Sequence, residues 1–504
     1  MRKLLRPFVL LVVLFLPTAL SADQGLSFQL TFDPKLHSEP FTGRVLIFMS
    51  DEFGQQPRLQ QSWTSRQPIF GAQVKDWKPG ETLTITDPIG YPYALADLPP
   101  KKYAIQAVMH LNPDQPHSGK AIGNLYSKPI KQDLDPALGG SIELNITKIV
   151  KEPTDRPLPP RAKLVEFKSK LLSGFHHRDI TMRAIVMPPT EYETNPDEKF
   201  PAIYVIPGFG GDERQAAMMA AMYGKPAAPM VKVCLDGMWA LGHHVYADSD
   251  NNGPWGKALT EELIPHLEKE FRLIPESRAR FLTGHSSGGW SSLWLQVAYP
   301  DFFGGVWSTS PDPVTFKDFC GTDLYDPEAN FYTDADGKLR PMMRRKGKVV
   351  VVTRDSCRAE EVLGPGDQYF SFEAVFSPRG PNGMPRQLWN RKTGKLDRKT
   401  VESWKRYDIV EKLKKEWPEI GPKLKGKLTI IMGDEDTFYL EGATRILKDE
   451  LEKLGSDARA IIVPGKDHGT IMFTKPFRAM MKEMSEQFTG KPEDATTSKP
   501  SDEE

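Results

Sequence analysis

The stretch that decides the fold is Arg280-Phe281-Leu282-Thr283-Gly284-His285-Ser286-Ser287-Gly288, which continues into a helical pattern from Trp290. An apolar run, a Gly-x-Ser-x-Gly pattern and a helix start follow one another here. In such a strand, turn and helix, the two glycines allow a sharp turn and the serine is held out at the edge of a sheet. The positive end of the helix favours a negative charge that develops nearby. The pattern predicts that Ser286 is a nucleophile, and the alternative is an ordinary Gly/Ser turn at a helix start.

A serine hydroxyl needs a neighbouring base to become nucleophilic. In folds with this motif, the base is a histidine that follows first the serine and then an acid along the chain. Of the ten histidines, only His468 lies after Ser286, in the segment Gly465-Lys466-Asp467-His468-Gly469. This segment follows an apolar run over 461–463 that is typical of a strand. We therefore predict His468 to be the general base.

The acid that orients the histidine is predicted at another strand end. The apolar run 428–432 is followed by Gly433-Asp434-Glu435-Asp436-Thr437-Phe438. Asp436 has the usual offset from the glycine in α/β-hydrolases, and we predict it to be the orienting acid. Asp434 and Glu435 are alternatives, and Asp312, just after another predicted strand, is a further candidate. The unused carboxylates would cap turns.

An oxyanion that forms at Ser286 needs two backbone N–H donors. One is predicted to be the N–H of Ser287, directly after the nucleophile. The other is predicted in Pro207-Gly208-Phe209-Gly210-Gly211, which follows an expected strand over 203–206. We favour the N–H of Phe209, with Gly210 as the alternative.

Residues 162–488 alternate apolar, β-branched runs with helical patterns. Strands are expected over 202–206, 231–235, 280–283, 305–308, 428–432 and 460–463, and helices over 259–271, 287–298, 442–454 and 476–488. This alternation predicts an α/β-hydrolase fold whose mainly parallel sheet is covered on both faces. An insertion over about 310–425 interrupts it, with a strand expected over 349–352. This insertion is either a cover over the site, part of it a lid, or a surface decoration.

Residues 23–150 have a different pattern. Short alternating runs over 27–32, 43–48 and 103–108 are separated by Pro, Gly and Asp. Several short strands with turn residues between them predict an all-β, sandwich-like N-terminal domain. A proline-rich linker over 151–161 joins it to the α/β domain, and the polar tail over 489–504 is expected to be disordered.

The first 22 residues resemble a cleaved secretory signal. Basic residues precede the apolar run 8–16, and Pro17 and small residues follow, with the cut expected after Ser21 or Ala22. This layout predicts an exported protein, periplasmic or secreted, and the apolar run is too short for a stable membrane span. Lysine plus arginine equals aspartate plus glutamate at 66 each. That balance gives no electrostatic footprint for nucleic acid, and the basic run 344–346 is taken as solvated surface.

Other patterns carry weaker chemical hypotheses. Asp248-Ser249-Asp250-Asn251-Asn252-Gly253 begins like a calcium loop, but Leu259 stands where that loop needs a glutamate. The pairs His176-His177 and His243-His244 are adjacent and cannot share one helix face as a metal pair would, although His243-His244 could line the cleft. Cys234 is expected in the core, and Cys320 and Cys357 could form a disulfide. No metal or organic cofactor is therefore expected.

The segment Trp255-Gly256-Lys257-Ala258-Leu259-Thr260-Glu261-Glu262-Leu263-Ile264-Pro265 and the stretch 280–289 together resemble the putative-esterase family. That family includes esterase D, enterochelin esterases, feruloyl esterases and mycolyltransferases. The resemblance covers about 165–488, and the leading β-domain is most similar to the enterochelin esterase arrangement. It implies a triad of Ser286, Asp436 and His468. The family often has histidine before the oxyanion loop, where this chain has Pro207.

These observations predict an exported serine carboxylic-ester hydrolase that works through an acyl-enzyme on siderophore, feruloyl or acetyl esters. Its partner would be a small-molecule or polysaccharide-linked ester, and the oligomeric state is left open. One alternative is an acyltransferase of the same fold. The other is a non-catalytic protein that binds carbohydrate or a partner, in which case the β-domain could carry the function.

Overall fold

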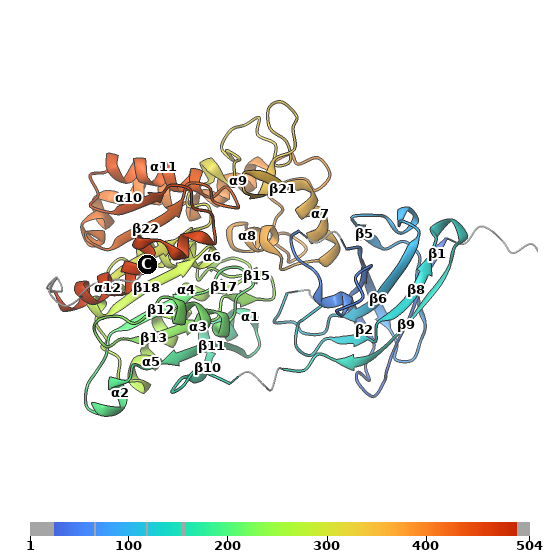
Figure 1. Ribbon diagram of the computed structural model, residues 1–504, viewed down its shortest axis with the longest axis horizontal. Helices are drawn as coiled ribbons and strands as arrows, with labels where there is room; N and C mark the ends of the chain where they lie inside the picture. Colours follow the sequence, from blue (N-terminus) through green and yellow to red (C-terminus); the bar gives the residue numbers. More distant parts are fainter. Residues whose placement is uncertain (1–24, 65–66, 117–118, 153–156, 491–504) are drawn as a thin grey trace, which may run out of the picture.

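The computed structural model describes residues 25–64, 67–116, 119–152 and 157–490. A nine-stranded and an eight-stranded sheet organise these residues. Figure 1 shows the β-rich N-terminal part (blue to cyan) beside the α/β part (green to red), with α7 (Thr353–Leu363) and β21 (Lys348–Val352) between them at the top. The expected signal over 1–22 lies outside the described residues. So does the expected tail, apart from Thr489 and Gly490, which end a helix.

All nine N-terminal strands belong to one hydrogen-bonded sheet, in the order β4-β1-β9-β7-β6-β2-β3-β5 with β8 beside β6. The strands are β1 (Leu26–Phe32), β2 (Phe41–Ser50), β3 (Ile69–Trp77), β4 (Leu83–Ile85), β5 (Ile89–Tyr91), β6 (Lys101–Met109), β7 (Leu125–Ser127), β8 (Ile130–Leu134) and β9 (Gly140–Ile149). Because β7 and β8 both pair with the same edge of β6, the sheet branches there.

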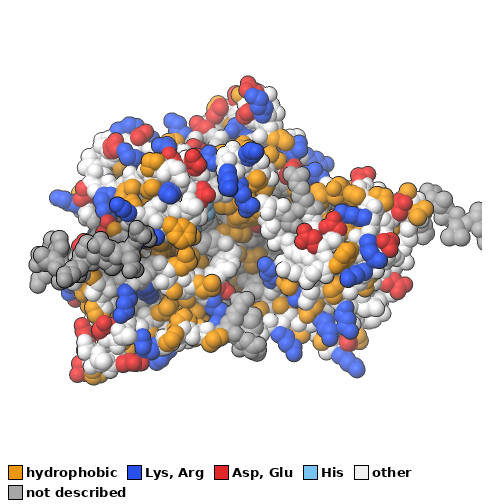
Figure 2. Space-filling model, in the orientation of Figure 1, with side chains coloured by type: hydrophobic (Ala, Val, Ile, Leu, Met, Phe, Trp, Pro, Cys, Tyr) orange, Lys and Arg blue, Asp and Glu red, His pale blue; other side chains and the backbone are white. Residues whose placement is uncertain are grey.

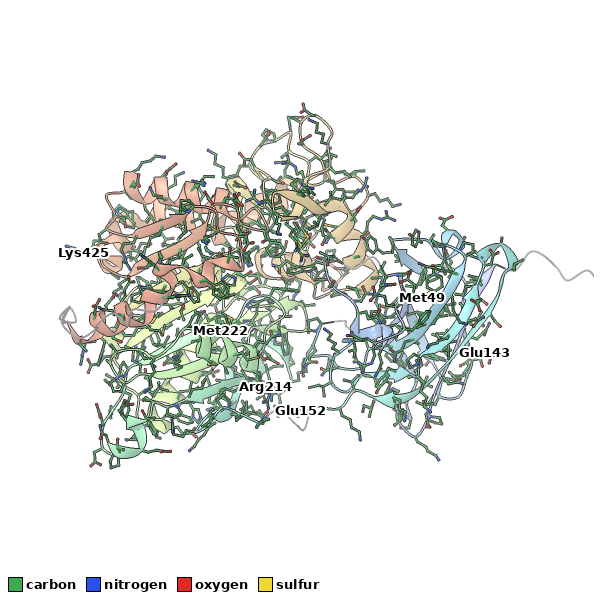
Figure 3. All side chains as sticks on the ribbon, viewed as in Figure 1. Met49, Glu143, Glu152, Arg214, Met222 and Lys425 are labelled. Carbon is green, nitrogen blue, oxygen red and sulfur yellow. The ribbon has the colours of Figure 1, made fainter. Side chains whose placement is uncertain are left out.

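The branched sheet folds back on itself around one apolar core. The Phe28 ring on β1 lies 5.7 Å from the Phe70 ring on β3, although four strands separate β1 from β3 in the sheet. Burial alternates along β1 and β9, as period-2 side chains require, whereas β2 and β6 are buried over most of their length. In Figure 3, Met49 lies within this part of the molecule and Glu143 on its outer side, in accord with their buried and exposed states. The N-terminal region is thus β-rich and sandwich-like.

The second sheet has the order β10-β11-β13-β12-β18-β19-β22-β23. Its strands are β10 (Lys163–Ser169), β11 (Ile180–Met187), β12 (Ala202–Ile206), β13 (Val231–Leu235), β18 (Arg280–His285), β19 (Gly305–Thr309), β22 (Leu428–Gly433) and β23 (Arg459–Val463). The first two pairings are antiparallel and the other five are parallel. The predicted α/β-hydrolase fold with a mainly parallel sheet is confirmed.

Helices cover both faces of this sheet. Along β12, Tyr204 and Ile206 belong to the core on one face and Ile203 and Val205 to the core on the other. The first core includes residues of α1 (Lys170–His176), α5 (Ile264–Glu270), α6 (Ser287–Ala298), α10 (Ile409–Leu424) and α11 (Glu441–Lys453). The second includes residues of α3 (Glu213–Met222) and α12 (Lys475–Thr489). A strand buried on both faces explains the continuous apolar runs in the sequence.

One expected helix differs in detail from its pattern. The helix expected over 259–271 begins as α4 (Trp255–Lys257), passes through a π-helical stretch over Ala258–Leu263 and ends as α5. Pro265 has no N–H to donate within the helix, and a π-bulge is one way in which a helix absorbs that loss.

The inserted segment between β19 and α10 packs against the α/β part and faces the N-terminal sheet. It contains β20 (Pro341–Arg345), β21, α7, α8 (Gln368–Phe376) and α9 (Arg398–Trp404). All three cysteines are free, so the disulfide between Cys320 and Cys357 that the sequence left open is not formed. Val362 of α7 packs with Leu46, Phe48 and other residues of the N-terminal sheet. The insertion therefore joins the two sheets.

The surface shown in Figure 2 has Lys/Arg and Asp/Glu side chains interspersed, with apolar side chains between them. Among the described residues, no helix is both long enough and apolar enough to cross a membrane.

Candidate active site

Ser286 lies in a sharp turn between β18 and α6, at the carboxyl end of the central strand. Its backbone has φ 61° and ψ −126°, a conformation that a non-glycine residue rarely adopts. The chain packs so tightly here that a Cβ on Gly284 would lie 2.2 Å from the Gly288 carbonyl oxygen. A Cβ on Gly288 would lie 2.1 Å from the Ile206 carbonyl oxygen. The two glycines of the motif are therefore required by the turn.

His468 and Asp436 meet at the same edge of the sheet, beyond the ends of β23 and β22. His468 Nδ1 donates a hydrogen bond of 2.7 Å to Asp436 Oδ2. The histidine must be the donor because an ionised carboxylate can only accept. The Asp436 side chain is fully buried and that of His468 is 13% exposed. Asp436 Oδ1 accepts a second hydrogen bond, from the Phe438 N–H (2.9 Å), which fixes the carboxylate plane.

The charges around His468 determine its protonation. Burial lowers the pKa of His468. The charge of Asp436 and the hydrogen bond to it raise this pKa, and so do the charges of Asp312 and Asp467. The net result is a raised pKa. The His285 ring lies 4.5 Å from the His468 ring. Burial and the neighbouring His468 lower the pKa of His285 well below its usual value, so His285 is neutral. The neutral His285 ring therefore adds no positive charge beside His468.

The other candidate acids have different partners. Asp434 Oδ1 accepts from the Gly465 N–H, and the Glu435 N–H donates to the Lys466 carbonyl, so both stabilise the turn. Asp312 lies close to the nucleophile, where its Oδ2 accepts from Ser287 Oγ (2.5 Å). Burial raises the pKa of Asp312 to about 6, although the hydrogen bond from Ser287 Oγ lowers it. Of the four carboxylates, only Asp436 is hydrogen-bonded to His468 among the described residues.

The loop that follows β12 passes next to Ser286. A Cβ on Gly208 would lie 3.3 Å from Ser286 Cβ and 3.9 Å from its Oγ. Gly210 donates its N–H to the Met238 sulfur (3.2 Å), whereas the N–H groups of Phe209 and Ser287 have no hydrogen-bond partner within the described parts of the chain. This difference favours Phe209 over Gly210 as a donor, alongside the first-turn N–H of Ser287.

His243 supports this loop from the protein interior. Its Nε2 donates to the Pro207 carbonyl (3.0 Å), while its Nδ1 accepts from the Val245 N–H (3.1 Å). Burial lowers its pKa to about 4, so the ring stays neutral and keeps this tautomer. His244 stacks on Trp255 with ring centroids 3.8 Å apart. Both rings are buried, and His243 acts beneath the loop rather than as part of the cleft wall.

Arg344 was misjudged from sequence, where the run 344–346 is taken as solvated surface. Its guanidinium donates to the Asp436 carbonyl (2.9 Å) and to Glu441 (2.6 Å), and it lies over the Tyr439 ring. Arg344 comes from β20 of the insertion, so its partners are far away in sequence and no local pattern reveals them. It anchors the loop that carries Asp436.

A small apolar chamber of about 30 Å³ opens at Ser286. Its apolar walls come from three parts of the chain, namely Met342, Tyr369 and Phe372 of the insertion, Phe438 and Leu440 after β22, and Trp63 of the N-terminal region. No local sequence pattern connects Trp63 with Ser286. We call this space the acyl chamber.

The loop that begins like a calcium site binds protein groups instead. Asp248 accepts from the Lys257 N–H and the Tyr299 hydroxyl, Asn251 donates to carbonyls of the insertion, and Asp250 pairs with Arg406. No set of three or more His, Cys, Asp or Glu side chains is placed to hold a metal ion within the described ranges.

The comparison with known families agrees with this geometry. The family model described as "Putative esterase" matches residues 177–459, which is more than half of the chain. The chain belongs to the putative esterase family. As the family and its α/β-hydrolase fold indicate, the protein is a carboxylic ester hydrolase of the serine type.

Solved structures with a similar fold are distant in sequence. An S-formylglutathione hydrolase from Agrobacterium tumefaciens is 15% identical and covers 65% of this chain and 95% of its own, with a TM-score of 0.37. FphF, a fluorophosphonate-binding serine hydrolase from Staphylococcus aureus, is 15% identical over 65% and 99% of the two chains, with a TM-score of 0.40. A ferulic acid esterase from Anaeromyces mucronatus is 15% identical over 66% and 92%, with a TM-score of 0.34. The search of curated proteins gave no match.

Proposed function

We propose that the esterase works through an acyl-enzyme on Ser286, with His468 as the base and Asp436 as the orienting acid. The observation that carries the proposal is the buried hydrogen bond of 2.7 Å between His468 and Asp436 at the edge of the sheet that presents Ser286. A carboxylate that accepts from Nδ1 leaves the lone pair of Nε2 free to take a proton. This is the tautomer that a general base needs.

The reaction then proceeds in two steps. Ser286 Oγ attacks the ester carbonyl carbon as His468 Nε2 takes its proton, and the N–H groups of Phe209 and Ser287 bind the oxyanion. The tetrahedral intermediate expels the alcohol, which receives that proton from His468. A water molecule, deprotonated by His468, then attacks the acyl-enzyme and releases the acid. No metal or organic cofactor takes part in the proposed steps.

The hydroxyl of Ser286 must turn to reach its base. Here it lies next to the Asp312 carboxyl group, whose pKa it lowers, and in the described structure no hydrogen bond joins it to His468. In the absence of substrate such catalytic hydrogen bonds are often loose and form only in the complex. We infer that a rotation about the Cα–Cβ bond of Ser286 precedes attack.

The test is hydrolysis of p-nitrophenyl acetate by the wild type, Ser286→Ala and His468→Ala, with Ser403→Ala on α9 as a matched control. Members of a triad act as a unit, so each of the first two changes should lower kcat by about 10⁴-fold or more, and their double variant should lose little further. Ser403→Ala should keep wild-type activity. Release of free acetate in the presence of added glycerol separates hydrolysis from acyl transfer. Full activity of Ser286→Ala would overturn the assignment.

We also propose that the protein is exported. The support is the sequence alone, with basic residues, a short apolar run and small residues over 1–22. Sequencing the N-terminus of the protein recovered from the periplasm or the medium should give a chain that begins at residue 22 or 23. An intact residue 1 in a cytoplasmic fraction would contradict export.

A further inference from the structure

Trp63 belongs to the N-terminal region by sequence but packs in the active site. It lies between a 3₁₀ turn at Pro57–Leu59 and β3, and its side chain packs against the core of the α/β part rather than the core of its own sheet. Its ring stacks on Phe209 (centroids 6.1 Å apart, 24°) and meets Phe438 edge-on (5.0 Å, 83°). Phe438 in turn meets the His468 ring at 5.0 Å. Trp63 therefore touches both the oxyanion loop and the wall beside the base.

The position of Trp63 is fixed by contacts between the two parts of the molecule. The Trp63 side chain lies beside the carboxyl group of Asp367, the residue that caps α8, and lowers the pKa of that carboxyl against the effect of burial. Arg44 of β2 donates to the Glu361 carbonyl (2.7 Å) and, through Nε, to the Val362 carbonyl (3.0 Å). These polar contacts hold the loop of the N-terminal region against the insertion.

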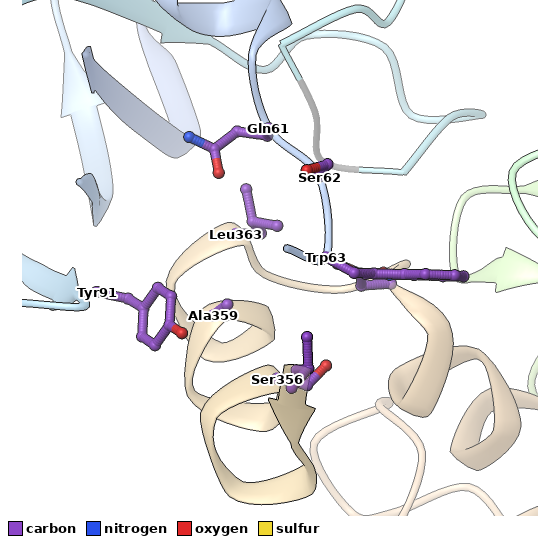
Figure 4. Close-up of a pocket in the computed structure, with 9 residues that line it drawn as sticks. Gln61, Ser62, Trp63, Tyr91, Ser356, Ala359 and Leu363 are labelled. Carbon is purple, nitrogen blue, oxygen red and sulfur yellow. The ribbon is translucent and has the colours of Figure 1, made fainter. Parts of the chain in front are cut away.

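Trp63 also separates two cavities of very different size. On one side is the acyl chamber of about 30 Å³ that Ser286 lines. On the other is a cavity of about 340 Å³. Figure 4 shows this second cavity between the loop of Gln61, Ser62 and Trp63 and the helix α7 that carries Ser356, Ala359 and Leu363. Ser62 at its rim is exposed, so the second cavity opens to solvent.

The size of the acyl chamber limits the acyl group that it can hold. A water molecule needs roughly 10–15 Å³ on this measure, so 30 Å³ holds about two water-sized groups, which suits the methyl and carbonyl of an acetyl group. The acyl part stays on Ser286 through the acyl-enzyme, whereas the alcohol must leave and water must enter. The small apolar chamber, which Ser286 lines, therefore suits the acyl part.

Resting on the proposed acyl-enzyme function, we propose that Trp63 is a specificity-determining residue, contributed by the N-terminal β-region, that limits the acyl group to acetyl. Its indole forms the wall between the two cavities. Without this wall the chamber joins the larger cavity, and longer acyl chains fit. The N-terminal region thereby takes part in substrate selection.

The experiment measures kcat/KM of the full chain on p-nitrophenyl acetate, butyrate and hexanoate. One surplus methylene against a rigid pocket is discriminated by about 10-fold or more, so the wild type should prefer acetate to butyrate by at least that factor. In Trp63→Ala the butyrate-to-acetate ratio should rise at least tenfold, and Trp63→Phe should restore most of the acetate preference. Phe53→Ala, an exposed aromatic of the same region, should keep the wild-type ratio.

A ratio of two substrates on one preparation does not depend on the folded fraction, so partial unfolding of a variant cannot produce the result. An unchanged ratio in Trp63→Ala, or an equal change in Phe53→Ala, would overturn the role of Trp63. Ser286→Ala is assayed in parallel on acetate. If it remained active, the proposed function would fail whatever Trp63 does; if it were inactive and the ratio did not move, only the inference about Trp63 would fail.

Discussion

Replacing Asp436 by asparagine removes one charge while keeping the shape of the side chain. Asp436 is fully buried, and its Oδ1 accepts from the Phe438 N–H at 2.9 Å. An asparagine must place its only oxygen at that N–H, which turns its NH₂ toward His468. His468 Nδ1 must then accept, and the proton of a neutral ring moves to Nε2. The base would hold the wrong tautomer to take a proton from Ser286.

The expected loss in kcat is about 10⁴-fold, as a wrong tautomer costs in a Ser-His-Asp triad. That corresponds to about 5.5 kcal/mol of activation free energy. The pH profile should change as well. In the wild type the pKa of His468 lies above its usual 6.5, because the Asp436 charge outweighs burial. Activity should therefore rise as pH increases through this raised pKa, since only the neutral ring can act as the base. Without Asp436 burial dominates, the pKa falls, and the acid limb moves to lower pH.

Initial rates on p-nitrophenyl acetate from pH 5 to 9 test both effects. Asp434→Asn is the matched control, because Asp434 accepts from the Gly465 N–H and leaves His468 untouched, and it should stay within about tenfold of wild type. The reasoning fails if Asp436→Asn keeps more than a tenth of wild-type kcat. It also fails if the acid limb of Asp436→Asn moves to higher pH.

Three further changes test the surroundings of the triad. Burial raises the pKa of Asp312 from 3.8 to about 6, so the folded state loses stability as pH rises from the lower to the higher of these values. Asp312→Asn should therefore gain about 3 kcal/mol relative to the wild type in urea unfolding at pH 8 and nothing at pH 3, and a loss at pH 8 would contradict this. Gly288→Ala places a Cβ against the Ile206 carbonyl. This change should abolish activity and lower the Tm, measured by circular dichroism, by several degrees. An unchanged Tm would show that the turn has room for the Cβ. His243→Phe removes the hydrogen-bond donor to the Pro207 carbonyl. It should lower kcat by about 10–100-fold with little effect on KM. An effect confined to KM would argue against a role of His243 in positioning the oxyanion loop.

The α/β part of the fold could be predicted because its signals are local. The apolar runs over 202–206 and 231–235 coincide with β12 and β13, since a central strand buried on both faces must be apolar throughout. The order of Ser286, Asp436 and His468 along the chain can likewise be read from the sequence without knowledge of the contacts in the fold. The π-helical stretch between α4 and α5 could not be predicted, because it depends on how the chain relaxes around one proline.

The rest of the site depends on contacts between distant segments. Trp63 stands in a loop with no catalytic residue types, and Arg344 stands in a basic run of ordinary appearance. Trp63 reaches the site because the insertion joins the N-terminal sheet to the α/β part, and Arg344 because the insertion packs against the loop that carries Asp436. Propensity and spacing describe neighbours along the chain, so they carry no information about such partners.

Covalent labelling tests the central claim most directly. An organic fluorophosphonate loses fluoride when an activated serine Oγ attacks its phosphorus, and the chain gains one phosphonyl group per active site. Intact mass and peptide mapping of the labelled wild type should find one group, on Ser286, and Ser286→Ala should remain unlabelled under the same conditions. Labelling of Ser287 or of a serine outside this turn, or undiminished labelling of Ser286→Ala, would contradict Ser286 as the nucleophile.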